Sequence, residues 1–226
     1  AGAEDGFAGV IDLIRMEQIT WDETSAGEKY AYGAISAAYR EAAEAAREKL
    51  IETVAENDDA IMERYLGEEA IDEADLVAAI RRATIGLKLV PVLCGSALKN
   101  KGVQPLIDAI VALLPSPVDV PPITGHHPET GEPISCPPRE TAPLVALIFK
   151  VSMIEGRKLS FVRVYSGKLV AGTEVYNASR STKEKLSRIM LMHANKRERV
   201  DTVGAGSIVG VVGLKDSSTG ETLCHK

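Results

Sequence analysis

The β architecture of the second half of the chain follows from the stretch Leu159-Ser-Phe-Val-Arg-Val-Tyr-Ser-Gly-Lys-Leu-Val-Ala-Gly-Thr-Glu-Val175. Its first part is rich in aromatic and β-branched residues (Phe161, Val162, Val164 and Tyr165), which favours a strand. Gly167 and Gly172 supply the positive φ that tight turns require. The stretch therefore predicts a β-hairpin with a tight turn at 166–167 and a second bend at 171–172.

Further strands are predicted on both sides of this hairpin, at 144–151, 185–192 and 207–212. Strands at this spacing indicate a small closed barrel. The segment 124–141 is rich in Pro, Gly and polar residues and is expected to be a surface loop. The prolines of 115–122 stop a helix and stiffen the chain. We therefore predict two domains, 1–115 and 116–226.

The first half has the pattern of helices around one buried strand. Apolar residues recur at helical spacing in 36–57, 58–66, 72–87 and 103–114, and the last of these helices is expected to face inward with Leu106, Ile110 and Leu113. The short apolar run 89–93 predicts a buried strand, followed by a loop at 94–102. Residues 7–19 are expected to form a strand, and the chain is expected to begin in the middle of a domain. The order helix, strand, loop, helix predicts an α/β unit.

Charge is distributed unevenly over a chain whose formal net charge is −6. Residues 1–115 carry 21 acidic and 11 basic residues, whereas 116–226 carry 11 acidic and 15 basic ones. The two halves are therefore expected to meet different partners. No apolar run is long enough to span a bilayer, and the N-terminus lacks the pattern of a signal peptide.

Cysteine and histidine patterns argue against a metal site and against a disulfide framework. Cys94, Cys136 and Cys224 lie far apart in the sequence with no Cys-x-x-Cys pair, which fits a reducing cytosol. His126 and His127 are adjacent and have no carboxylate array around them, so they make a poor ion site. We predict no bound metal and a cytoplasmic protein.

Several segments resemble one family of proteins. Residues 163–167, Arg-Val-Tyr-Ser-Gly, followed by Leu169, Gly172 and Val175, resemble the β-barrel that follows the GTPase domain in translational GTPases. Within that class, 190–198 (Met-Leu-Met-His-Ala-Asn-Lys-Arg-Glu) and 213–223 (Gly-Leu-Lys-Asp-Ser-Ser-Thr-Gly-Glu-Thr-Leu) resemble the elongation factor G family. Residues 7–13 and 113–122 match the same family, so the resemblance runs from end to end.

The resemblance implies a fold class and a function. The fold would be α/β, an incomplete GTPase domain with a helical insertion at 36–87, followed by an all-β translation-factor barrel. The full-length family couples GTP hydrolysis to movement of tRNA and mRNA through the ribosome and uses GTP or GDP with Mg²⁺. The expected partners are the small-subunit ribosomal RNA and the ribosomal stalk protein, with no membrane and no DNA.

The loop 94–102 follows the predicted buried strand and precedes a helix, where backbone N–H groups can face a ligand. From the residues alone, a plain connector between strand and helix explains it as well. The resemblance implies more, because this loop is similar to the Ser-Ala motif whose backbone donates to the guanine carbonyl oxygen. The implied guanine-binding residues are Ser96, Ala97 and Leu98.

Three motifs that GTP hydrolysis needs are missing from the GTPase-like half of this sequence. It has no G-x-x-x-x-G-K-[ST] phosphate loop, no Asp-x-x-Gly switch and no Asn-Lys-x-Asp guanine motif, and the Asp-x-x-Gly match at 201–204 lies in the predicted barrel. We therefore predict that the chain is a fragment that neither hydrolyses GTP nor binds it tightly. No arrangement of residues suggests catalysis of another kind.

Two charged sets are candidate contact surfaces. Four carboxylates recur at steps of three and four along the first long helix, which is either a solvated face or, as the resemblance implies, the contact for the stalk protein: Glu41, Glu44, Glu48 and Glu52. A basic cluster in 180–199 is either an ordinary charged edge or a contact for ribosomal RNA phosphates, with these candidates: Lys183, Lys185, Arg188, Lys196 and Arg197.

Two alternatives to this interpretation stay open. One is a sister translational GTPase, of the ribosome-protection or release-factor type, although 190–198 and the helical insertion argue against it. The other is a non-enzymatic RNA-binding barrel with a helical adaptor. An autonomous protein of that second kind is expected to begin with a complete structural unit, whereas this chain is expected to begin in mid-domain.

Overall fold

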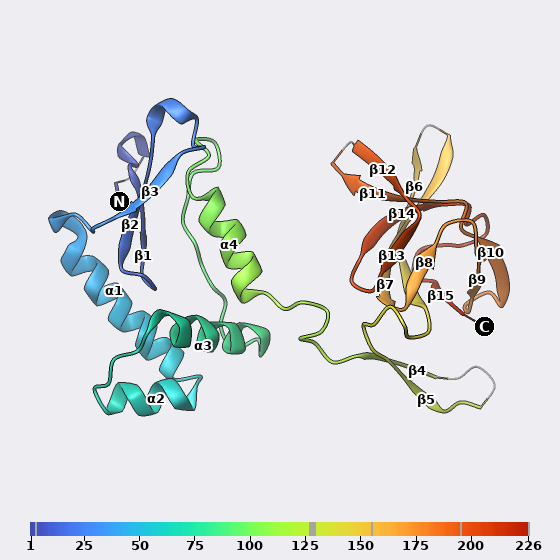
Figure 1. Cartoon of the computed structure of the whole chain (residues 1–226), viewed down its shortest axis with the longest axis horizontal. Coiled ribbons are helices and arrows are strands. Elements are labelled where there is room, and N and C mark those ends of the chain that lie inside the picture. The colour runs from blue at the N-terminus through green and yellow to red at the C-terminus, as the bar shows by residue number, and fades with distance from the viewer. Residues whose placement is uncertain (3, 127–129, 155, 195, 226) are drawn as a thin grey trace. The chain divides into compact units, whose positions relative to one another are not determined.

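The computed structural model describes residues 1–226 except 3, 127–129, 155, 195 and 226. The chain forms two compact units, Ala1–Leu114 and Pro115–Lys226, each with its own secondary structure (Figure 1). His127 of the histidine pair and Asn195 of the 190–198 segment lie outside the described residues.

The first unit opens with a three-stranded antiparallel sheet in the order β1-β2-β3. Its strands are β1 (Gly9–Asp12), β2 (Glu17–Trp21) and β3 (Tyr30–Gly33), with short 3₁₀ turns at Glu4–Gly6 and Glu23–Ser25. The single strand expected over 7–19 is wrong, because a turn interrupts it. The Asp12 carboxylate accepts hydrogen bonds from the N–H groups of Ile14 (2.8 Å) and Arg15 (3.0 Å), which reverses the chain into β2.

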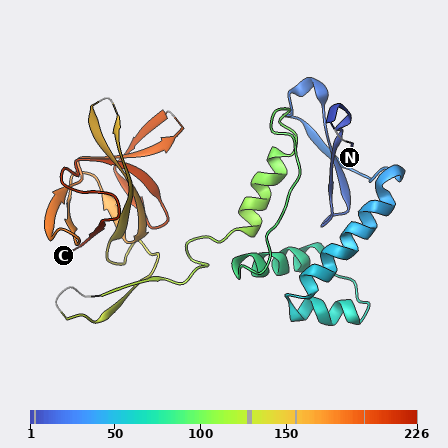
Figure 2. The same cartoon turned by 180° about the vertical axis from the view of Figure 1, so that it is seen from behind.

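Four helices follow, close to the positions expected from apolar spacing: α1 (Ala37–Ala55), α2 (Asp59–Leu66), α3 (Glu73–Ile85) and α4 (Val103–Leu113). Asp58 and Asp72 cap α2 and α3 by accepting from the N–H groups of Ile61 (3.3 Å) and Asp75 (2.8 Å). Figure 2 shows these helices from the other side. Their shared core consists of Val54, Ala55, Ile61, Leu76, Ala79, Ile80 and Leu113.

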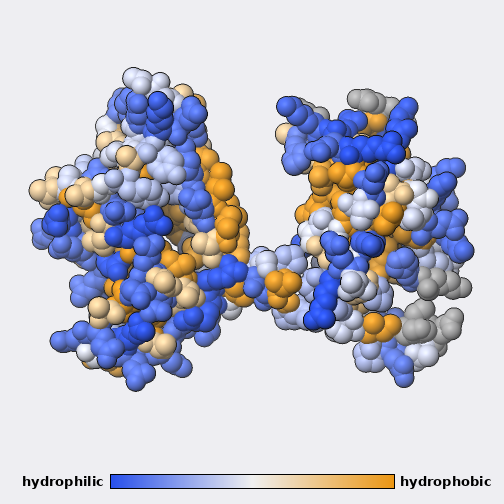
Figure 3. Space-filling view, viewed as in Figure 1, coloured by the Kyte–Doolittle hydropathy of each residue, from blue (hydrophilic) through white to orange (hydrophobic). Residues whose placement is uncertain are grey.

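The buried strand expected at 89–93 is absent, and α4 does not face inward as predicted. The chain is irregular there, and the side chains of Val90 and Val92 are each 85% exposed. A buried parallel strand needs parallel neighbours, and the described part of this unit has only the antiparallel β1-β2-β3 sheet. Of the three α4 residues expected inside, only Leu113 is buried, while Leu106 and Ile110 are exposed. Figure 3 shows the resulting apolar stripe along α4.

The second unit is a curled antiparallel sheet of eight strands in the order β10-β9-β15-β6-β7-β14-β11-β12. Among the described residues, the two end strands of this order, β10 and β12, do not pair with each other. Two backbone hydrogen bonds from the 171–172 bend contact the chain next to these strands: Gly172 N–H donates to the Leu186 carbonyl (2.6 Å), and Ala171 N–H donates to the Asp201 carbonyl (2.8 Å). The strands are β6 (Val145–Ile154), β7 (Arg157–Ser166), β9 (Glu174–Asn177), β10 (Thr182–Lys185), β11 (Arg188–His193), β12 (Lys196–Val200), β14 (Ile208–Val212) and β15 (Thr222–Cys224).

The inner face of this sheet forms the larger of the two cores. Alternate residues of each strand point inward, as in Val162 and Val164 of β7, which are fully buried. The all-β half of the predicted fold class is thus observed as a curled barrel. Its core consists of Leu144, Ala146, Ile148, Val162, Val164, Leu169, Val175, Leu186, Ile189, Val203, Val209, Val211, Leu214 and Leu223.

The predicted hairpin around Gly167 is wrong in its pairing, although the turn residues are as expected. Gly167 has a φ of +70°, but β7 pairs with β6 and β14, whereas β8 (Lys168–Val170) pairs with β13 (Thr202–Gly204). The turn is tied to the incoming chain, because Gly167 N–H donates to the Arg139 carbonyl (2.9 Å) and Ser166 Oγ to the Pro137 carbonyl (2.8 Å). Gly167 therefore makes a corner of the barrel.

Two other expectations for this unit need correction. The surface loop expected at 124–141 contains a hairpin, β4 (Ile123–His126) with β5 (Pro133–Cys136). The strand expected at 185–192 is broken into β10 and β11 at Leu186, whose N–H donates to the Thr173 carbonyl (2.9 Å) and whose side chain enters the core.

Candidate functional site: the 96–101 turn and two charged surfaces

The predicted guanine-contacting residues lie on a tight turn at the N-terminal end of α4 (Figure 1). Ser96 N–H donates to the Lys101 carbonyl (2.8 Å), and Lys101 N–H donates back to the Ser96 carbonyl (3.0 Å). Asn100, with a φ of +53°, closes the tip by donating its N–H to the Ala97 carbonyl (3.1 Å). Residues 97–99 are thereby displayed to solvent, and the Leu98 side chain is 98% exposed.

Two glycines allow the base of this turn to close. A Cβ on Gly95 would lie 2.7 Å from the Lys101 carbonyl oxygen, and a Cβ on Gly102 would lie 2.9 Å from the Gly95 Cα. Gly102 also has a φ of +90° and immediately precedes α4. Only glycine combines this conformation with so close a backbone approach.

The side chain of Lys101 anchors the turn from behind. It is 3% exposed, its Nζ donates to the Phe7 carbonyl (3.2 Å), and it forms an ion pair with Glu23. The hydrogen bond from this ammonium, and then its charge, lower the pKa of the Glu23 carboxyl below its ordinary value. Lys101 is therefore a structural residue, and its positive charge points away from the tip of the turn.

The connection between β2 and β3 forms the wall behind the turn, and the sequence contained no signal for it. Asn100 Nδ2 donates to the Ala26 carbonyl (3.3 Å), and Gln104 Nε2 donates to the Gly27 carbonyl (2.7 Å). Trp21 Nε1 in turn donates to Gln104 Oε1 (3.2 Å). These contacts join residues more than seventy positions apart, which local patterns do not encode.

The turn can donate hydrogen bonds to a ligand through three of its backbone groups. Among the described residues, no protein acceptor faces the N–H groups of Ala97, Leu98 and Lys99. The N–H of Ser96 is already used within the turn. Of the three predicted residues, Ala97 and Leu98 are thus the ones with a backbone donor available.

The four predicted carboxylates do lie together on the exposed side of α1, and we call Glu41, Glu44, Glu48 and Glu52 the acidic ridge. Arg47 does not neutralise this ridge, because its Nη1 donates to the Leu13 and Ile14 carbonyls, both at 2.6 Å. Glu52 accepts from the Tyr65 hydroxyl (2.9 Å). That hydrogen bond first, and then burial and the ridge charges, raise the pKa of the Tyr65 hydroxyl.

The predicted basic cluster is divided between strands at the two ends of the sheet order. Lys183 and Lys185 are exposed on β10, and Lys183 Nζ lies 3.8 Å from Glu174 Oε2. Arg188 on β11 and Arg197 on β12 line one small pocket. Lys196 is exposed on β12, at the hairpin end where it pairs with His193.

Two other charged residues of the 180–199 segment belong to one polar network, in which Glu184 is buried and Arg180 is exposed. Glu184 accepts from Ser217, and Arg180 Nε donates to Glu221 Oε1 (2.6 Å). The network is centred on the fully buried Asn177, whose Nδ2 donates to Ser217 Oγ (3.0 Å) and to Glu221 Oε2 (2.8 Å). Because this network takes up one basic and one acidic residue, the net charge of the remaining residues of the segment is unchanged.

Glu221 makes the barrel's stability depend on pH. Burial disfavours the ionised carboxylate. Hydrogen bonds from Asn177, Ser218 and Arg180 outweigh this effect and lower the pKa of the Glu221 carboxyl below the ordinary 4.5. A carboxyl whose pKa is lower in the folded state stabilises the fold above the unfolded pKa, and this stabilisation is lost as pH falls through the folded value. We expect Glu221→Gln to lower the melting temperature at pH 7 and the difference from wild type to shrink below about pH 4.5. A difference that stays constant down to pH 3 would contradict this, as circular dichroism melts can show.

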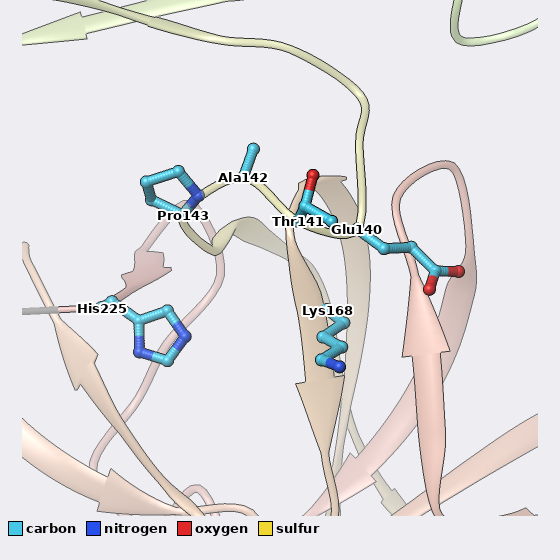
Figure 4. A pocket seen from close by; sticks show the side chains of 6 residues that line it. All are labelled: Glu140, Thr141, Ala142, Pro143, Lys168 and His225. Atoms are coloured by element: carbon cyan, nitrogen blue, oxygen red, sulfur yellow. The ribbon is translucent and has the colours of Figure 1, made fainter.

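Other places in the described chain have weaker claims to be a site. A hollow of about 660 Å³ is lined by residues that include Glu140, Lys168 and His225, but Figure 4 shows that these side chains do not converge. No group of three or more His, Cys, Asp or Glu side chains in the described ranges could hold a metal ion. None of the described helices has both the length and the apolar character that a membrane crossing requires.

Comparison with known proteins identifies relatives along the whole chain. Residues 143–226 match the family model "Elongation factor G domain 2". The chain is 54% identical over 225 residues to "Elongation factor G 2" of Syntrophus aciditrophicus and 50% identical over 226 residues to "Elongation factor G" of Aquifex pyrophilus. All of this chain is covered, but it spans only 33% and 32% of those relatives' lengths. The resemblance predicted from the sequence is confirmed.

A solved structure shows the same fold. A crystal structure of a protein from Thermus thermophilus matches all of this chain with a TM-score of 0.77, at 21% identity and over 31% of its own length. The predicted combination of a partial α/β domain and an all-β barrel is confirmed at the level of fold class.

Proposed function

We propose a function from the premise that this chain is a segment of the elongation factor G family, similar to it from end to end. The chain is part of a translational GTPase that drives movement of tRNA and mRNA on the ribosome. Within that protein it supplies a guanine-facing turn, an acidic surface for the ribosomal stalk protein and a barrel that lies against small-subunit ribosomal RNA. It carries out no chemistry by itself.

The 96–101 turn is the observation that supports this proposal most directly. Its tip presents the N–H groups of Ala97 and Leu98 to solvent, while its base is fixed by Lys101 and by the β2–β3 connection. Two fixed donors without a protein acceptor suit a carbonyl oxygen such as O6 of guanine. Adenine has an amino group at the same position and offers no acceptor there.

GTP and Mg²⁺ belong, in this proposal, to the full-length protein. The turn fits the guanine end of the nucleotide, but the sequence contains no phosphate loop to hold the triphosphate. The phosphates and the metal ion would therefore be held by residues outside this chain. Binding energy for phosphates dominates nucleotide affinity, so the chain alone binds guanine weakly and does not hydrolyse GTP. The protein works in the cytoplasm, where ribosomes translate.

The guanine contact can be tested by NMR titration of the ¹⁵N-labelled chain with GMP, using AMP as the matched control. We expect GMP to shift the amide signals of Ala97 and Leu98 with a dissociation constant of about 1 mM or weaker, as a contact worth ~4 kcal/mol implies. AMP should leave those signals in place. Equal shifts with both nucleotides, or shifts confined to other residues, would contradict the assignment.

A glycine behind the turn provides a variant that alters its geometry alone. Gly27 has a φ of +80°, and a Cβ there would lie 2.4 Å from the Asn100 carbonyl oxygen. Gly27→Ala should therefore displace the turn and weaken the GMP-induced shifts, whereas Gly33→Ala, where a Cβ meets nothing within 4 Å, should not. Equal GMP responses from both variants would show that the wall behind the turn does not position it.

A further inference from the structure

A small basic pocket lies on the outer surface of the barrel, between the end of the β6–β7 ladder and the β11–β12 hairpin. Its volume is about 100 Å³, and four of its lining residues are cationic: Arg157, Lys158, Arg188 and Arg197. Two of these, Arg157 and Lys158, belong to β7 and lie outside the basic cluster predicted from the sequence. The pocket therefore brings together cationic residues that are up to forty positions apart in the chain.

The strand register explains why the cations converge there. Arg157 pairs with Ile154 at the last step of the β6–β7 ladder. Arg188 begins β11 and pairs with Val212 of β14, while Arg197 pairs with Met192 on β12. Because β14 lies between β7 and β11, the pocket is bordered by cations on both flanks and by apolar side chains below.

The floor of the pocket is apolar and closely packed. Leu159, which is 3% exposed, and Met190 line it. The glycine at position 210 of β14 lets Leu159 approach, since a Cβ there would lie 3.0 Å from the Leu159 Cδ1. Charges above an apolar floor are screened less by water than charges on an open surface, so an anion held there is bound more strongly.

Two of the pocket's cations, Arg157 and Arg188, have no acidic partner among the described residues. In the part of the chain that the structure describes, no Asp or Glu lines the pocket. Lys158 is held differently, because its Nζ donates to the carbonyls of Lys215 (2.8 Å) and Ser217, so it contributes charge more than a free donor.

The size and chemistry of the pocket fit one phosphate group. Its volume of about 100 Å³ is well below the roughly 300–1,000 Å³ of pockets that hold whole small-molecule ligands, so it suits one group better than a nucleotide. Guanidinium groups donate paired hydrogen bonds to phosphate oxygens in a planar geometry that lysine lacks. A phosphodiester of a nucleic acid backbone meets these requirements without any contact to a base.

We propose that this pocket, formed by Arg157, Arg188 and Arg197, holds one backbone phosphate of RNA and is the anchoring point of the barrel's RNA contact. The inference rests on the proposed function, which gives the barrel an RNA partner, and it deepens that function by naming the site. It also assigns to Lys183 and Lys185 a minor role, because they lie on β10, outside the pocket.

The test compares two double variants of the whole chain that remove the same charge. Arg157→Gln with Arg188→Gln alters the pocket, and Lys183→Gln with Lys185→Gln alters β10. Binding to a fluorescein-labelled RNA stem-loop is followed by fluorescence anisotropy at several salt concentrations. All four residues are exposed, so both variants should retain the wild-type circular dichroism spectrum and melting temperature.

We expect the pocket variant to raise the dissociation constant about tenfold. The plot of the logarithm of the association constant against the logarithm of the salt concentration should become less steep by ~0.7–0.9, the value for one phosphate. The β10 variant should change the constant less than about threefold. If the wild-type chain binds RNA but the β10 variant weakens binding as much as the pocket variant, the pocket assignment is wrong and the proposed function survives. If the wild-type chain does not bind RNA in a salt-dependent way, both are wrong.

Discussion

Asn177→Ala is expected to lower the free energy of unfolding of the barrel by about 3 kcal/mol, because the variant loses three hydrogen bonds at a fully buried position. The side chain donates to Ser217 Oγ and Glu221 Oε2 and accepts from the Arg180 N–H (3.2 Å). Each lost bond leaves a partner group incompletely satisfied, and such groups cost more than the mean value of a hydrogen bond when they are buried.

The measurement is thermal unfolding of the whole chain, observed by circular dichroism and by tryptophan fluorescence. A loss of this size corresponds to a fall in melting temperature of roughly 10–20 °C for a domain of this length. Trp21 is the only tryptophan in the sequence and lies in the first unit, so its fluorescence should report a transition that the variant leaves unchanged. Lys183→Ala on the neighbouring exposed strand is the control, with an expected change within about 0.5 kcal/mol. An unchanged barrel transition in Asn177→Ala would show that the network adds no stability.

Reversing two charges of the acidic ridge is expected to weaken binding of the ribosomal stalk domain at least about tenfold, or ~1.4 kcal/mol. All four ridge carboxylates are exposed, and Arg47 is turned away onto the Leu13 and Ile14 carbonyls. A ridge of one sign attracts an oppositely charged partner over a distance comparable to the screening length. The loss should therefore appear mainly in the association rate and should diminish as salt is raised.

The experiment uses Glu44→Lys with Glu48→Lys and measures association by surface plasmon resonance with the isolated stalk domain. The matched control is Glu68→Lys with Glu69→Lys, which changes the net charge equally in the exposed turn after α2. The control should bind with an association rate within about twofold of wild type at moderate salt. Equal weakening by both variants would indicate a general charge effect, and unchanged binding by the ridge variant would rule out the ridge as the contact.

The local elements of this fold could be predicted from the sequence, but their pairing could not. Helical spacing and the aspartates at 58 and 72 placed α2 and α3 to within two residues, because caps and apolar periods act within a few positions. The Gly167 turn was predicted, but the partners of β7 and β8 were not, because they depend on backbone contacts with 137–139 and on β13. A period of two identifies a strand without naming its neighbour.

The main error of the sequence interpretation was the prediction that several apolar residues of the first unit are buried. The pattern of 89–93 and of Leu106 and Ile110 is that of a buried layer, and the residues are nevertheless exposed. A hydrophobic pattern indicates that one face of a helix or strand is buried, but it does not identify the element that packs against that face.

In the candidate site, too, the local features were predictable from the sequence and the contacts between distant segments were not. The positions of Ser96, Ala97 and Leu98 on a turn before α4 were predictable from a resemblance of residues close together in sequence. The contributions of Glu23, Gln104 and the pocket arginine at 157 were not, because each depends on a contact between distant segments. The division of the basic cluster between β10 and the β11–β12 hairpin likewise follows from sheet order alone.

If this chain is a docking segment of a ribosomal GTPase, it should compete with the full-length factor for ribosomes. The labelled chain is sedimented with ribosomes, with and without an excess of full-length elongation factor G. We expect that the chain sediments with ribosomes, that the full-length factor displaces it, and that the chain alone releases no phosphate from GTP. A chain that stays in the supernatant, or one that the full-length factor does not displace, would rule out this role on the ribosome.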